Sequence, residues 1–110
     1  MTRPTPEWVA KKRVVFVYPD GHRAAGHIAI GKPYTLGDGV DEGLNYEAHC
    51  PVEITGIHKS SHPPIGAGTL SALLHAVHLV EFHLRGFIEQ GGRILDADGE
   101  SDIEVDTLFG

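Results

Sequence analysis

Residues 69–92, TLSALLHAVHLVEFHLRGFIEQGG, decide the fold because they form the one long segment with helical periodicity. Thr69 is a suitable N-cap, and Gly91 stands where a helix places a glycine just after its last turn. At about 100° per residue, the large apolar side chains fall in one stripe that we expect to lie on a sheet. This stripe contains Leu70, Leu73, Leu74, Val77, Val80, Leu84 and Ile88. The sequence therefore predicts one long helix from about residue 69 to residue 90.

The segments before the helix have the composition of strands. RVVFVY (13–18) and HRAAGHIAIG (22–31) flank the turn sequence PDG, which predicts a hairpin. In YEAHCPVEITGI (46–57) apolar and polar residues alternate, so Ala48, Cys50, Val52 and Ile54 should face the core. Pro51 points the other way and lacks an amide donor, which favours a sheet edge or a bulge. We expect a single α+β domain over residues 1–110, with an antiparallel sheet of three to five strands packed by one long helix.

Four of these motifs, in order, resemble an uncharacterised family of small bacterial domains of unknown function. They are IAIGKP, CPVEITGI, the helix sequence TLSALLHAVHLVEFHL and the closing GGRIL, and the resemblance spans about residues 14–95. The resemblance implies a fold but supplies no catalytic residue, substrate or cofactor. In size, charge and architecture the chain is also similar to the immunity proteins that accompany bacterial toxins.

The sequence DADGESDIEVD, residues 96–106 and here called the acidic segment, has a carboxylate at every second position. An extended backbone would direct all six to one side, whereas Gly99 favours a turn and hence a short hairpin. A calcium loop is improbable, because Ser101 and Thr107 stand where a glycine and a glutamate are needed. The two remaining interpretations are a charged edge that prevents sheet pairing and a binding surface for a cationic partner. The candidate partner-binding residues are Asp96, Asp98, Glu100, Asp102, Glu104 and Asp106.

Charge and composition exclude several classes of protein. The formal net charge is −6, with 15 acidic and 9 basic residues, and only Lys11, Lys12 and Arg13 form a basic cluster. This argues against a nucleic-acid partner, which needs a basic surface. A single cysteine, Cys50, excludes an intrachain disulfide, and its alternating position predicts a buried, inert thiol. With no apolar run of about 20 residues, we expect a cytoplasmic protein with no membrane partner.

Eight histidines raise the question of a metal site. His75 and His78 share a helix face, His58 and His62 lie in a loop, and His27 and His49 could meet beside Glu47 or Glu53 if their strands pair. None of these sets supplies three convincingly spaced ligands, so we expect no metal, no cofactor and no catalytic residue. The alternative is a small metal-dependent enzyme that uses a histidine cluster.

Two large apolar residues of the predicted helix, Leu79 and Phe82, fall opposite the core stripe, beside His75 and His83. Either the C-terminal segment covers them, or His75, Leu79, Phe82 and His83 form the interface of a homodimer. The leading interpretation is a non-enzymatic binding domain, similar to an immunity or inhibitor protein. Its acidic segment would contact a basic protein partner, such as a toxin.

Overall fold

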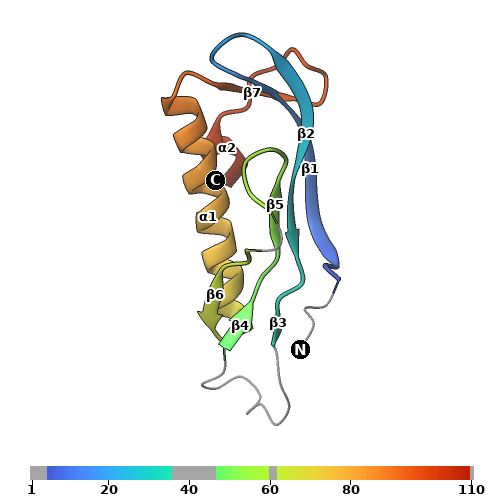
Figure 1. Cartoon of the computed structure of the whole chain (residues 1–110), viewed down its shortest axis with the longest axis vertical. Coiled ribbons are helices and arrows are strands. Elements are labelled where there is room, and N and C mark those ends of the chain that lie inside the picture. Colours follow the sequence, from blue (N-terminus) through green and yellow to red (C-terminus); the bar gives the residue numbers. More distant parts are fainter. Residues whose placement is uncertain (1–4, 36–46, 60–61, 110) are drawn as a thin grey trace.

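The computed structural model describes residues 5–35, 47–59 and 62–109. The elements, in chain order, are β1 (Trp8–Val17), β2 (Arg23–Gly31), β3 (Tyr34–Thr35), β4 (Glu47–His49), β5 (Val52–Ile54), β6 (Ile65–Ala67), α1 (Thr69–Glu89), β7 (Arg93–Asp96) and α2 (Val105–Phe109). One antiparallel sheet has the order β5-β2-β1-β7, and a smaller one has the order β3-β4-β6. Figure 1 shows α1 running beside both sheets, with α2 next to the upper half of the helix and below β7. The predicted α+β fold with one long helix is confirmed.

The predicted hairpin is formed by β1 and β2. Val17 pairs with Arg23, and the Gly21 amide donates to the Tyr18 carbonyl at 2.8 Å. Gly21 has φ 94°, a conformation that glycine adopts without strain. The hairpin supplies the two central strands of the larger sheet, with β5 and β7 at its edges.

Residues 46–57 differ from the prediction, because the expected strand is broken at Pro51 into β4 and β5, which belong to different sheets. Proline has no amide to donate, and the neighbouring groups bond elsewhere: the Cys50 amide donates to the Pro64 carbonyl and the Pro51 carbonyl accepts from Gly31. The predicted inward face is nevertheless correct, although Pro51, which was expected to point the other way, is buried too. Its four members, Ala48, Cys50, Val52 and Ile54, are all 0 % exposed.

The ends of α1 are close to those predicted. The N-cap is Gly68 rather than Thr69, and no side chain caps this end. After the C-cap Gln90, the Gly91 amide donates to Ile88 and the Gly92 amide donates to Phe87, both at 3.0 Å. With Gly91 at φ 99°, these two bonds form a Schellman motif, as the glycine pair predicted.

The predicted core stripe of the helix is correct at Val80 and Leu84, and Leu73 packs against the core, but the stripe is wrong at three other positions. The fully buried residues are Ala72, Ala76, Val80 and Leu84, whereas Leu70, Leu74 and Ile88 are 70 %, 49 % and 40 % exposed. The reason is close packing against β6, where a Cβ on Gly66 would lie 2.4 Å from the Ala72 amide nitrogen. Only small side chains fit between backbones at that distance, so the helix turns its alanines inward. Within the described residues, α1 is not apolar enough over its length to cross a membrane.

Candidate partner-binding groove

The acidic segment forms a narrow hairpin. Beyond β7 the chain turns at Gly99 (φ 73°) and returns, so that the Asp96 amide donates to Ser101 at 2.7 Å and the Ile103 amide donates to Ile94 at 2.8 Å. The hairpin interpretation is therefore correct, and the straight strand with six carboxylates on one side is not. Residues 105–109 then form α2, an element that the sequence analysis did not predict.

Three of the six carboxylates are paired within the chain. Asp96 lies 3.4 Å from Lys12 on β1, Asp102 is held by Arg93 at 3.0 Å, and Asp106 accepts a hydrogen bond from Arg85 on α1. Arg85 also donates to Glu81 at 2.7 Å. The hydrogen bonds that Arg85 donates to Asp106 and Glu81 raise the pKa of Arg85 above its ordinary value. These pairs attach the acidic segment to β1, β7 and α1.

Asp98 organises the tip of the hairpin. Its carboxylate accepts hydrogen bonds from the Glu100 amide at 2.8 Å, the Ser101 amide at 3.0 Å and the Ser101 hydroxyl at 3.0 Å. These bonds lower the pKa of Asp98, and the bond from the Glu100 amide has the largest effect. The Arg23 guanidinium donates to the Gly99 carbonyl at 2.8 Å from the other side. The tip is therefore held in one conformation from several directions.

The returning chain closes a groove of about 530 Å³ against the C-terminal half of α1. Its floor is apolar, with Ile94 and Val105 2 % and 5 % exposed and with Ile88 at its side. We call it the charged groove; its lining is Arg85, Ile88, Glu89, Gly92, Arg93, Ile94, Asp102, Ile103, Glu104, Val105 and Asp106. Each arginine is paired with one aspartate, so Glu89 and Glu104 are the excess negative charges.

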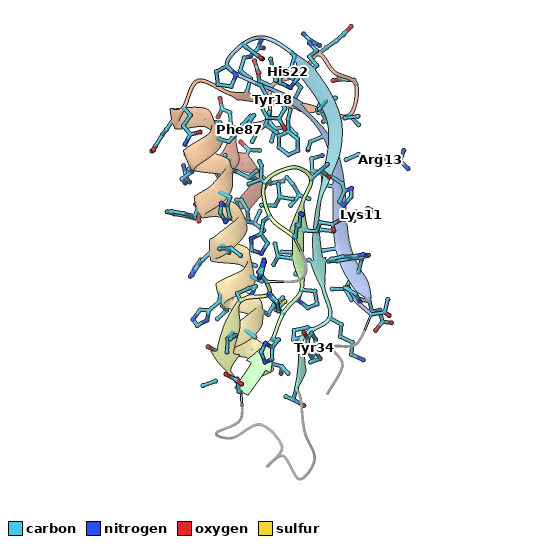
Figure 2. The ribbon with its side chains drawn as sticks, viewed as in Figure 1. Lys11, Arg13, Tyr18, His22, Tyr34 and Phe87 are labelled. Carbon is cyan, nitrogen blue, oxygen red and sulfur yellow. The ribbon has the colours of Figure 1, made fainter. Side chains whose placement is uncertain are left out.

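A second groove lies on the other flank of the same helix half. It has a volume of about 420 Å³ and lies where the β1–β2 turn and the turn after β5 meet the helix. We call it the neutral groove; its lining is Tyr18, Pro19, Gly56, Ile57, Phe82, His83, Gly86, Phe87 and Gln90. Figure 2 shows Tyr18, His22 and Phe87 gathered at this end of the molecule. The Tyr18 ring stacks on His22 at 4.3 Å and meets Phe87 edge-on at 5.3 Å.

The four residues expected at a dimer interface do not share one outer face. His75 is exposed and its ring bonds to the Ile65 carbonyl at 2.7 Å, whereas Leu79 packs against the core, contrary to its predicted outward position. The His83 ring lies 5.4 Å from that of His58. Phe82 remains strongly exposed, at 71 %, and the C-terminal segment does not cover it.

His27 and His49 do not meet. The Nε2 atom of His27 lies 2.6 Å from Glu53 on β5, which ties two strands of the larger sheet together. His49 belongs to the smaller sheet, is 7 % exposed and stacks on Tyr34. Its Nδ1 atom has no hydrogen-bond partner within the part of the chain that the structure describes. The two histidines therefore cannot act as one cluster.

His58 bonds to the His62 carbonyl at 2.9 Å through Nε2, and burial lowers its pKa. Among residues 5–35, 47–59 and 62–109 there is no group of three or more His, Cys, Asp or Glu that could hold a metal ion. Burial raises the pKa of the Cys50 thiol to about 11, so this cysteine is a thiol rather than a nucleophilic thiolate at neutral pH. The predicted buried position of Cys50 is confirmed.

The basic cluster of β1 is divided between two sides of the strand. Lys11 and Arg13 are exposed, and Figure 2 shows both on the side away from α1. Lys12 points the other way and pairs with Asp96. Alternation along the strand thus separates the three cations that are contiguous in sequence.

Comparison of the chain with family models, with curated proteins and with solved structures gives no match.

Proposed function

We propose that this chain is a non-enzymatic protein-binding domain, similar in its mode of action to an immunity or inhibitor protein, and that the charged groove receives a basic segment of its partner. The observation that supports this is the pairing of an apolar floor with excess negative charge. Ile94 and Val105 form the floor, and Glu89 and Glu104 stand on the walls. A lysine or arginine side chain fits such a site, because its methylenes pack on apolar surface while its charge meets a carboxylate.

The acidic residues have two different tasks in this proposal. Asp96, Asp102 and Asp106 are occupied by cations of the same chain and hold the segment in place. Among the described residues, no ion pair involves Glu89, Glu100 or Glu104, which are exposed. Glu89 and Glu104 line the charged groove and Glu100 does not, so Glu89 and Glu104 are the two glutamates that can attract a partner's cations there.

Preorganisation favours binding at this place. Three ion pairs and the Asp98 hydrogen bonds fix the segment before any partner arrives. A surface that is already ordered loses less conformational entropy on association, so more of the contact energy contributes to affinity. The groove therefore presents Glu104 on a segment whose backbone is already held in place.

The test compares two double variants with the same change in net charge. The probe is a synthetic peptide of alternating lysine and leucine, titrated into the ¹⁵N-labelled chain, with a serine–leucine peptide as the uncharged control. Glu89→Gln with Glu104→Gln removes the excess charge of the groove. Two exposed charge pairs contribute about 1 kcal/mol together, so we expect affinity for the lysine peptide to fall about fivefold.

The matched control is Glu7→Gln with Glu100→Gln, at two exposed glutamates that do not line the groove. We expect it to retain affinity, and the wild-type shifts to centre on Ile94, Ile103 and Glu104. An equal loss in both double variants would point to diffuse attraction by the whole acidic segment. Binding of both peptides with equal strength, or shifts elsewhere, would contradict the proposal.

A further inference from the structure

Gly86 is a glycine inside a helix, at a position where no contact among the described residues requires the absence of a side chain. It lies inside α1 and is half-buried, yet a Cβ built on it would meet nothing within 4 Å. Gly66 and Gly92 are different, because a Cβ there would lie 2.4 Å from Ala72 and from the Phe87 ring. Glycine inside a helix is less stable than alanine, so a glycine with open space above it points to a contact outside the chain.

The surroundings of Gly86 combine a hollow with a projection. The neutral groove passes over it, with Tyr18 and Phe87 among its walls. Phe82 stands one helical turn earlier and is 71 % exposed. A twofold interface uses the same patch on both subunits, so the patch must be complementary to itself. A large exposed aromatic ring beside a groove that lacks a side chain meets this condition, because the ring of one copy can fill the groove of the other.

Charge decides between the possible occupants. Among the described residues that line the neutral groove, none is Asp, Glu, Lys or Arg. The chain has a net charge of −6, so two copies repel one another unless they meet through an uncharged patch. A basic partner, in contrast, would find no carboxylate here and would prefer the charged groove.

We propose that the neutral groove is the interface of a homodimer about a twofold axis, in which Phe82 of each copy enters the groove of the other and lies over Gly86. The charged groove is on the opposite flank of α1 and stays open in this dimer, so the inference does not depend on the proposed function. It replaces the expected interface on the outer helix face, since Leu79 packs on the core and His75 bonds to Ile65.

Sedimentation velocity at tens of micromolar protein tests the dimer. The wild-type chain should sediment at twice its mass of 11.9 kDa. Phe82→Ser removes the projection and Gly86→Gln fills the hollow, so each should raise the dissociation constant at least tenfold. The Gly86→Gln chain should keep its circular dichroism spectrum and, at concentrations too low for the wild type to dimerise, melt no lower than the wild type, because glutamine is the better helix former.

Mixing the two variants provides the decisive measurement. In a mixed dimer the Phe82→Ser chain has an open groove and the Gly86→Gln chain has an intact ring, so one of the two contacts is restored. We expect the mixture to contain a heterodimer under conditions in which each variant alone is monomeric. The control is Leu70→Ser, at an exposed residue of the same helix that does not line the neutral groove, and this variant should remain dimeric.

A monomeric wild type at this concentration would overturn the inference. So would a dimer that survives both substitutions, one that Leu70→Ser dissociates equally, or a mixture of the two variants with no heterodimer.

Discussion

The two grooves share one half of one helix but are built in opposite ways. The residues that line the charged groove all come from one stretch of the sequence, between positions 85 and 106, and ion pairs hold its walls. The neutral groove brings together residues 18–19, 56–57 and 82–90, and aromatic contacts hold its walls. The first has a buried floor, and the second has an exposed ring at its rim. The difference shows that the two flanks of one helix border grooves of opposite character, one with excess carboxylates and one with no charged residue in its described lining.

The largest expected effect is a difference in the free energy of unfolding between a substitution in the buried floor of the charged groove and one at the exposed rim of the neutral groove. Ile94→Ala leaves a cavity below the charged groove, where Ile94 is 2 % exposed, and should lower the free energy of unfolding by about 3 kcal/mol. Phe82→Ala at the rim of the neutral groove should lower it by less than about 0.5 kcal/mol, because the ring is in solvent. Urea unfolding of dilute protein measures both, and equal losses would mean that Phe82 is held by its own chain.

A smaller effect distinguishes two glycines near the neutral groove. Gly86→Ala should raise the free energy of unfolding by about 0.5 to 1 kcal/mol, since helix propensity improves and the methyl meets open space. Gly91→Ala should lower it by about 1 kcal/mol, because alanine is strained at φ 99°. Thermal unfolding below the dimer concentration range gives both values. A loss of stability in Gly86→Ala would show that the chain itself requires that glycine.

The smallest effect concerns two residues outside the grooves, His58 and Asp98. They differ in the pH at which each stops contributing to the free energy of unfolding. Burial lowers the pKa of His58 below 6.5, so its neutral form is favoured in the native state and its contribution is lost as pH falls from 6.5 toward the native pKa. Hydrogen bonds lower the pKa of Asp98 below 3.8, so its contribution persists until pH falls below 3.8. The melting temperature should therefore drop slightly between pH 7 and pH 5 in the wild type and less in His58→Gln. An Asp98→Asn chain should show the same drop as the wild type over this range.

The elements that sequence analysis predicted well depend on neighbouring residues. The extent of α1 followed from its glycine pair, the hairpin from PDG, and the buried face of residues 48–54 from strict alternation. Each of these signals acts over a few residues, which is why a single sequence contains it.

The predictions that failed depend on distance in space. Which face of α1 is buried depends on how closely Gly66 approaches Ala72, and hydrophobicity alone assigned the larger leucines to the core. The partners of Asp96 and Asp106 are Lys12 and Arg85, 84 and 21 residues away. The acidic segment was visible in the sequence, but its pairing was not. Of the neutral groove the sequence offered only Phe82, His83 and Gly86, with nothing to indicate the two turns that complete it.

The corner at Cys50 and Pro51 sets a limit on changes in chain length. Loops usually accept an inserted residue, but residues 48–52 are all buried and the side chains of Ala48, Cys50, Val52 and Ile54 face one core, so the number of residues between the two strands is fixed. One extra residue would turn the side chains of either β4 or β5 toward solvent and bring polar neighbours inward. This buried connection between the two sheets is therefore a place where an insertion would do great harm, and sequence variants of this domain should differ there in residue type but not in length.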